Sequence, residues 1–269
     1  MSELIRPLVM GIVNVTPDSF SDGGRLADAA AAIAHGLRLI QQGADILDIG
    51  GESTRPGAEP VGLTEELDRV LPVIEGLAAR TDWAISVDTA KPEVAEAAVA
   101  AGASMWNDVS ALAAPGAAET AARLGCEVVL MHRRGEPRTM QHAPHYHDVV
   151  AEVIAELSAF AEAAIAAGVA RERIWLDPGI GFGKTAAHNL TLVRCLDRLV
   201  ALGFPVLFGA SRKRTIQAVD PTATDADDRL GGSLALALEA SRAGARAIRV
   251  HDVRETVQAL KLQAAIREA

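Results

Sequence analysis

Short aliphatic runs recur at regular intervals along the chain. They are LVMGIVNV from Leu8, ADILDIG from Ala44, AISVDT from Ala84, SMWNDVS from Ser104, EVVLMH from Glu127, RIWLDPG from Arg173, PVLFGAS from Pro205 and ARAIRVHD from Ala245. Each run is bounded by turn residues and alternates little between polar and apolar positions, which is typical of strands covered on both faces. We therefore expect eight buried strands.

Ala- and Leu-rich segments with helical spacing separate these strands, for example 28–42 and 147–167. Six of the segments end in a glycine one or two residues before the next strand, where a left-handed helix cap belongs: Gly43, Gly102, Gly125, Gly168, Gly203 and Gly244. Eight strand–helix units in 269 residues predict a (β/α)8 TIM barrel of the α/β class, as a single domain over residues 1–269. A doubly wound open sheet is the alternative, because periodicity does not show whether a sheet closes.

The composition agrees with this fold and excludes some classes of binding partner. Hydrophobic residues make up 49% of the chain but aromatic residues only 3%, so aliphatic side chains must build the core. A net charge of −9 opposes nucleic-acid and anionic-membrane partners. The N-terminal MSELIRPLVM lacks the basic start and apolar core of a signal peptide, and no run approaches membrane-spanning length. We expect a cytoplasmic protein.

Nearly every expected strand ends on a polar or ionisable side chain. The residues in question are Asn14, Asp48, Asp88, Asn107, His132, Asp177, Ser211, Arg249 and His251. In a (β/α)8 barrel the carboxyl ends of all strands converge on one rim, and active sites lie there. The pattern therefore predicts a single functional site at that rim.

Cations are concentrated at two of these strand ends. The stretch GASRKRT (209–215) follows the seventh strand, while Arg249 and His251 end the eighth. Barrel enzymes often bind phosphate between strands seven and eight, where backbone N–H groups already favour an anion. In a chain that is acidic overall, this indicates an anionic, phosphorylated substrate. An ion-paired surface turn is the structural alternative.

On the opposite side of the rim, Asp88, Asn107 and Asp177 end strands three, four and six. Such a group can hold a metal, perform acid/base catalysis, or bind a nitrogen heterocycle. A carboxylate accepts two N–H donors from a guanidine-like edge, and an amide offers one donor and one acceptor. A planar heterocycle carrying a phosphate group satisfies both sides of the rim.

The stretch WLDPGIGFGKT (175–185) is superficially like a nucleotide-binding loop. A P-loop requires G-x-x-x-x-G-K-[ST], but Pro178 stands where its first glycine belongs. A dinucleotide fingerprint requires G-x-G-x-x-G, whereas Gly179, Gly181 and Gly183 lie two residues apart. The surroundings must therefore decide the function of this loop.

Several stretches, in this order along the chain, resemble dihydropteroate synthases nearly end to end. They are NVTPDSFSDGG (14–24), GGESTRPGA (50–58), SVDTAKPEV (86–94), NDVSAL (107–112), LMHRRGEPRTMQ (130–141), LDPGIGFGKT (176–185), ASRKR (210–214) and RVHDV (249–253). The resemblance implies a (β/α)8 barrel. It also implies condensation of 6-hydroxymethyl-7,8-dihydropterin diphosphate with 4-aminobenzoate, which yields 7,8-dihydropteroate and diphosphate for folate synthesis.

The resemblance also implies roles for individual residues. The expected pterin-binding residues are Asp88, Asn107, Met131, Asp177, Phe182, Lys213 and Arg249. The expected diphosphate-binding residues are Asn14, Thr54, Arg249 and His251. Mg2+ is the expected cofactor, with Asn14 as its ligand. The expected aminobenzoate-binding residues are Phe20, Arg55, Pro56, Phe182 and Arg214. The expected catalytic residues are Asp22, Thr54, Arg55 and Lys213.

On this resemblance Asp177 accepts the 2-amino and ring N–H groups of the pterin, and the glycines shape the loop beneath it. Lys184 and Thr185 then need not touch phosphate. Arg214 stands where some family members have serine, which leaves aminobenzoate affinity open. The family implies a homodimer and competition between sulfonamides and aminobenzoate.

Other functions fit parts of the same pattern. Related barrels transfer a methyl group from methyltetrahydrofolate to a corrinoid protein. They would not need the cationic residues 211–213, here called the SRK turn, beside RVHDV (249–253). A non-catalytic pterin-binding homologue should have lost residues such as Asn14, Thr54, Arg55 or Lys213, and all are present. An unrelated phosphate-binding barrel enzyme fits only the cationic side.

Overall fold

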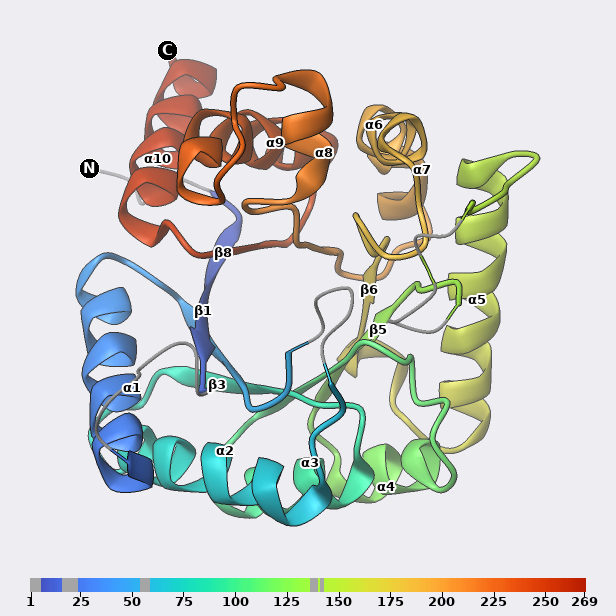
Figure 1. Ribbon diagram of the computed structural model, residues 1–269. Helices are drawn as coiled ribbons and strands as arrows, with labels where there is room; N and C mark the ends of the chain where they lie inside the picture. Colours follow the sequence, from blue (N-terminus) through green and yellow to red (C-terminus); the bar gives the residue numbers. More distant parts are fainter. Residues whose placement is uncertain (1–5, 16–23, 54–58, 136–139, 141–142) are drawn as a thin grey trace.

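The computed structural model describes residues 6–15, 24–53, 59–135, 140 and 143–269. Eight strands surround the centre of the molecule, and helices cover them from outside (Figure 1). The strands are β1 (Leu8–Asn14), β2 (Ile46–Gly50), β3 (Ala84–Asp88), β4 (Met105–Asp108), β5 (Glu127–Met131), β6 (Ile174–Asp177), β7 (Leu207–Phe208) and β8 (Ala247–Val250). Each lies within one of the aliphatic runs, so the expected strands are confirmed.

The helices follow the strands in strict alternation, with extra short helices late in the chain. They are α1 (Gly24–Gln41), α2 (Leu63–Ala78), α3 (Pro92–Ala100), α4 (Ala117–Leu124), α5 (Val149–Ala166), α6 (Ala186–Arg194), α7 (Leu196–Val200), α8 (Arg214–Val219), α9 (Leu230–Ala243) and α10 (Val253–Glu268), with 3-10 turns η2 (Arg171–Arg173) and η3 (Asp227–Arg229). All six glycines expected to cap helices have positive φ, between 61° at Gly125 and 116° at Gly102. Within the described residues no helix combines the length and apolarity needed to cross a membrane.

The sheet closes on itself. Its parallel strands follow the order β6-β5-β4-β3-β2-β1-β8-β7. A parallel bridge between Leu176 and Val206 joins the two ends, and the Leu176 N–H donates to the Pro205 carbonyl at 3.0 Å. The (β/α)8 barrel is therefore confirmed, and the open doubly wound sheet is excluded.

Inside the barrel, one layer of apolar side chains forms a plug below the rim. It consists of Met10, Ile46, Met105, Val129, Trp175, Leu207 and Ala247, all buried. Because side chains on a strand alternate between faces, the residue two positions further along points into the barrel again. On four strands that next residue is polar: Asp48, Asn107, Asp177 and Arg249. The two-residue period thus places a polar layer directly above the apolar plug.

Candidate active site

Arg249 joins the strand ends across the barrel mouth. From β8, its Nε donates to Asp48 Oδ2 at 2.6 Å and its Nη2 donates to Asp88 Oδ2 at 2.7 Å. Asn107 Nδ2 also donates to Asp48 Oδ2, at 3.2 Å. From the sequence, the cations and the carboxylates were expected on opposite sides of the rim. That separation is wrong, because Arg249 is long enough to reach the carboxylates of β2 and β3.

Burial dominates the electrostatics of this ion cluster. Removal from water raises the pKa of Asp88 to about 7, against the opposing pull of Arg249, and the neighbouring charge of Asp48 adds to the rise. Burial by itself would lower the pKa of Arg249, but Asp48 and Asp88 raise it well above its ordinary value. Asp48 is fully buried, and its Oδ1 has no hydrogen-bond partner in the described part of the chain. Because that oxygen is enclosed by protein, it is an unsatisfied acceptor inside the cluster.

Asp177 forms the other acceptor of the barrel mouth. Its Oδ1 accepts the Gly179 N–H at 2.7 Å. This bond bends residues 179–183, the glycine loop, back over the end of β6. Burial raises the pKa of Asp177 to about 6, although the Gly179 N–H and the charges of Lys213, Arg249 and Lys184 all lower it. Within the mouth, Asp177 and Asp88 are both almost completely buried carboxyl groups.

An apolar wall carries a cation beside Asp177. Phe182 packs in a buried cluster with Val109, Met131 and Met140. Lys213, which caps the N-terminus of α8, places its Nζ 4.2 Å from the centre of the Phe182 ring. A cation over an aromatic face is attracted by the negative face of the ring. The structure thus brings together Met131, Phe182 and Lys213, as the resemblance implied.

The SRK turn is fixed to the end of β8. Ser211 Oγ lies 3.0 Å from His251 Nδ1 and accepts the His251 backbone N–H at 3.2 Å. Arg212 has a left-handed backbone (φ 60°) and pairs with Asp252 at 2.6 Å and Asp227 at 2.5 Å. The guanidinium of Arg212 is therefore neutralised by these two carboxylates. The pair with Asp252 ties the SRK turn, which includes Lys213, to the residues that follow β8, which include His251.

Residues 216–228, an acidic segment that begins within α8, have a structural role that the sequence did not reveal. Arg229 is buried and donates to the carbonyls of Ala223 (3.1 Å) and Arg212 (3.0 Å) and to Gln217 Oε1 (3.1 Å). Together with the Asp227–Arg212 pair, these bonds attach the segment to the SRK turn.

Some predicted site residues lie outside the described part of the chain: Phe20, Asp22, Thr54, Arg55 and Pro56. The segment that leads to residues 54–58 is held from both sides. Lys91 Nζ contacts Glu52 Oε2 and Glu66 Oε2, each at 2.5 Å, and Arg69 donates to the Gly51 carbonyl at 2.7 Å. Gly51 and Glu52 are thus fixed next to the end of β2.

The remaining predicted residues occupy the edges of the site. Asn14 ends β1 and is half-buried, and a Cβ added to Gly50 would lie 3.9 Å from its Oδ1. Arg214 is exposed at the first residue of α8. Asn14 is therefore within the mouth, while Arg214 lies at its outer border.

Sequence reasoning gave no site role to two buried residues at the mouth. From the sequence Asp48 was expected only to end a strand; an acid inside the apolar run ADILDIG was the available signal, and the structure buries it completely. Lys184 was considered only as a phosphate contact, yet it is 2% exposed and lies beneath the glycine loop. A lysine that follows a glycine run can point outward or inward, and the sequence does not distinguish the two.

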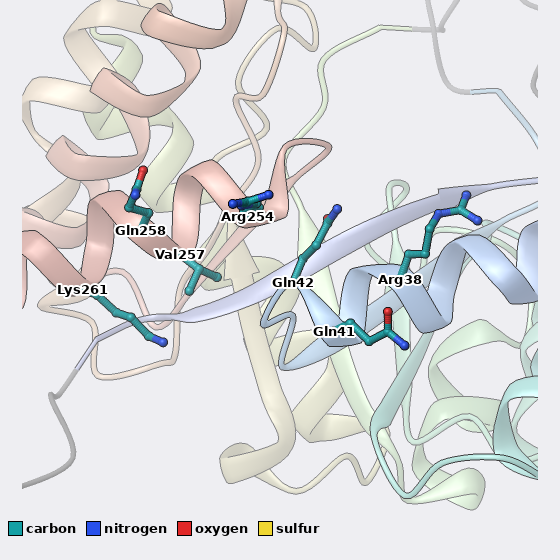
Figure 2. Close-up of a pocket in the computed structure, with 7 residues that line it drawn as sticks. All are labelled: Arg38, Gln41, Gln42, Arg254, Val257, Gln258 and Lys261. Atoms are coloured by element: carbon teal, nitrogen blue, oxygen red, sulfur yellow. The ribbon is translucent and has the colours of Figure 1, made fainter.

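A separate hollow lies on the outer surface, away from the barrel mouth. The end of α1 and the first half of α10 line it, with Arg38, Gln42, Arg254, Val257 and Lys261 among its residues (Figure 2). It contains none of the strand-end residues described above. The rim, and not this hollow, is the candidate active site.

A closed barrel with buried carboxylates and a cationic turn at one rim is the architecture of an enzyme site for a polar, anionic heterocycle. The sequence model of the family described as pterin binding enzyme matches residues 10–251. The chain therefore belongs to the family of pterin-binding enzymes.

Its relatives within that family are dihydropteroate synthases. The enzyme of Escherichia coli (strain K12) is 48% identical over 263 residues, covering 97% of this chain and 92% of the relative. The enzyme of Neisseria meningitidis serogroup C is 50% identical over 264 residues, covering 96% and 92%.

Solved structures of dihydropteroate synthases are also similar to this chain. Xanthomonas albilineans dihydropteroate synthase with 4-aminobenzoic acid has a TM-score of 0.93 and 55% identity, and covers 99% of this chain and 95% of that one. The same organism's enzyme in complex with 7,8-dihydropteroate has a TM-score of 0.90 and 52% identity, over 99% and 96%. Yersinia pestis dihydropteroate synthase with a sulfonamide drug has a TM-score of 0.93 and 47% identity, over 99% and 96%.

Proposed function

We propose that this site condenses 6-hydroxymethyl-7,8-dihydropterin diphosphate with 4-aminobenzoate to give 7,8-dihydropteroate and diphosphate. The observation that carries the proposal is the group of Asp88, Asn107 and Asp177 at the carboxyl ends of β3, β4 and β6, with the SRK turn on the same rim. Relatives that share about half of the sequence bind 4-aminobenzoic acid and 7,8-dihydropteroate.

The buried acceptors match a pterin. Its 2-amino group and ring N–H form a guanidine-like edge with parallel donors, which one ionised carboxylate accepts bidentately. Asp177 is placed for this, because only its Oδ1 is engaged by the loop N–H. Asn107 offers an amide donor and an amide acceptor to the remaining ring edge. Phe182 and Met131 supply an apolar wall for the ring.

The reaction needs no protein nucleophile. As the CH2–O bond breaks, its electron pair leaves with the diphosphate, and the dihydropterin ring stabilises the cation that remains. The aminobenzoate nitrogen then forms a C–N bond to the CH2 group and loses a proton. Lys213, in the SRK turn, and His251, which contacts Ser211 of that turn, would stabilise the leaving anion. Positioning and charge stabilisation of this kind each supply on the order of several kcal/mol.

Mg2+ is the cofactor we propose, with Asn14 as its protein ligand. Mg2+ prefers oxygen ligands and commonly takes few of them from protein, relying on phosphate and water for the rest. The amide oxygen of Asn14, at the end of β1, fits this. When bound, Mg2+ would neutralise charge on the diphosphate. We also propose a cytoplasmic homodimer, as the family resemblance implies.

Diphosphate release that depends on aminobenzoate is the direct test. Purified protein with the dihydropterin diphosphate and Mg2+ is expected to release diphosphate only when 4-aminobenzoate is added. Lys213→Met should lower kcat/KM by about a hundredfold, because it removes the cation beside both the pterin and the leaving group. Lys261→Met, the same change in the outer hollow, should leave the rate unaltered.

Release of diphosphate without 4-aminobenzoate would point to a pterin diphosphate hydrolase. Failure to bind the dihydropterin diphosphate at all would contradict the proposal.

Pterin binding should weaken as the pH falls through about 6. The raised pKa of Asp177, about 6, follows from burial, so its carboxylate form is complete only above that value. Because only the carboxylate accepts both N–H donors, affinity for 6-hydroxymethyl-7,8-dihydropterin should be full at pH 8. It should drop about tenfold per pH unit below the midpoint. Isothermal titration calorimetry between pH 5 and 8 measures this. A constant affinity over that range would remove Asp177 from the pterin site.

A further inference from the structure

Lys184 is buried and donates hydrogen bonds to the backbone of the glycine loop. It is 2% exposed, and its Nζ lies 3.0 Å from both the Gly179 and the Phe182 carbonyl oxygens. The same Nζ lies 2.8 Å from His132 Nδ1 and 3.3 Å from the His132 carbonyl oxygen. Burial lowers the pKa of Lys184 to about 7. In the ammonium form, which predominates below that pH, the four acceptors use all three N–H donors. No donor remains for a substrate.

His132 extends this network toward the surface. The residue directly follows β5, is fully buried, and its Nε2 lies 3.0 Å from Glu156 Oε2. Because Lys184 donates to Nδ1, the ring proton belongs on Nε2, which then donates to Glu156. Burial lowers the pKa of His132 to about 3, with the charge of Lys184 adding to it, so the ring stays neutral. Arg134 pairs with Glu156 and, at 2.9 Å, with Glu152.

The glycine loop is pressed against the segment that follows β5. A Cβ added to Gly179 would lie 1.9 Å from the His132 carbonyl oxygen, and one added to Gly183 would lie 2.2 Å from the Arg134 carbonyl oxygen. Both glycines have positive φ, 65° and 62°. Loop and segment therefore approach backbone to backbone, and Lys184 is the cation that binds carbonyls of both. The glycines serve this close approach and not a phosphate.

The loop in turn sets two parts of the barrel mouth. Its Gly179 N–H holds Asp177 Oδ1 at 2.7 Å, and its Phe182 ring lies beneath Lys213 Nζ. Whatever fixes Gly179 and Phe182 therefore fixes the carboxylate and the apolar wall. Lys184 contacts the carbonyl oxygen of both residues.

We propose that Lys184 is a positioning residue for pterin binding, which acts through His132 and Glu156 to hold the 179–183 loop so that Asp177 faces the cavity. This inference rests on the proposed function. Lys184 does not touch the pterin, because its donors face loop carbonyls and His132. Its loss lets Gly179 and Phe182 move, and Asp177 loses an oriented N–H and a nearby positive charge.

Two properties of Asp177 should change together. The Gly179 N–H and the charges of Lys213, Arg249 and Lys184 all lower the pKa of Asp177, against the effect of burial. Removal of Lys184 eliminates one charge and loosens the N–H. The pH midpoint of pterin binding should therefore move upward. A side chain that only adds to overall stability would not shift this midpoint.

The test compares Lys184→Met with Lys261→Met, which makes the same change on the outer surface. Binding of 6-hydroxymethyl-7,8-dihydropterin is measured by calorimetry at pH 8 and then down to pH 5, with thermal unfolding as the fold control. Lys184→Met is expected to raise Kd about tenfold and to raise the pH midpoint, since small misplacements of binding groups are costly. Lys261→Met should behave as the wild type.

The outcomes separate this inference from the proposed function. No pterin binding by the wild type would overturn both. Normal wild-type binding and turnover, with an unchanged Kd and midpoint in Lys184→Met and only a lower Tm, would overturn the inference alone. If Lys184→Met does not fold, Glu156→Gln replaces it, because Glu156 is partly exposed and the change keeps its shape. A rise in Kd of about twofold to fivefold would then support the network, and an unchanged Kd would overturn it.

Discussion

Asp177→Asn is expected to weaken binding of 6-hydroxymethyl-7,8-dihydropterin by about two to three orders of magnitude. The amide presents an N–H where the carboxylate accepted one, so a donor of the pterin meets a donor in a buried site. Losing a charged acceptor and leaving a buried donor unpaired together cost roughly 3–4 kcal/mol. Calorimetry at pH 8 measures the change. Asp197→Asn, on the exposed face of α7, is the matched control.

Asp177→Asn should not lower the stability of the unliganded protein at pH 8. Because burial raises the folded-state pKa of Asp177 to about 6, the stability that this group contributes is present below its unfolded pKa. That contribution is lost as the pH rises through 6. At pH 8 the buried carboxylate charge destabilises the folded state, and the neutral amide does not carry that charge. Wild-type affinity in Asp177→Asn would show that the pterin binds elsewhere on the rim.

Arg249→Met is expected to cause the largest loss of stability of any single change at the barrel mouth. It leaves Asp48 and Asp88 buried without the guanidinium that binds both at 2.6 and 2.7 Å. Removing one partner of a buried ion pair typically costs about 3–5 kcal/mol. Urea unfolding at pH 8 should show this loss, while Arg254→Met on the exposed side of α10 should change the free energy of unfolding little.

A second substitution distinguishes charge from packing in this experiment. Asp48→Asn in the Arg249→Met background removes one of the two uncompensated charges, so part of the lost stability should return. An Arg249→Met protein that is as stable as the wild type would show that the cluster is solvated and that Arg249 is dispensable for the fold. Recovery of pterin binding is not expected, because Asp88 still lacks its partner.

Much of the site could be predicted from the sequence because of a simple geometric rule. Side chains at the carboxyl ends of parallel barrel strands share one rim, so Asp88, Asn107 and Asp177 were brought together correctly. The rule says nothing about which side chains meet across the barrel. Arg249 and Asp48 are 201 residues apart, and their contact depends on the closure of the sheet and on the length of the arginine.

The burial of Lys184 could not be predicted for a different reason. The direction of its side chain depends on the left-handed turns at Gly179, Gly181 and Gly183, and on how closely the loop approaches the His132 carbonyl. Sequence spacing excluded a P-loop but did not reveal that the lysine turns inward. The role of Arg229 was hidden likewise, since its acceptors are mainly backbone carbonyls of a non-helical segment.

The pairing of β1 with β8 has a consequence for how the chain folds while it is being translated. During translation β1 emerges early and can pair with β2, but its other edge, from Leu8 to Gly11, finds its partner only when residues 247–250 have left the ribosome. Until then the nascent sheet has an apolar strand edge of the kind that templates aggregation. A chaperone that shields this edge during synthesis would improve the yield of folded protein.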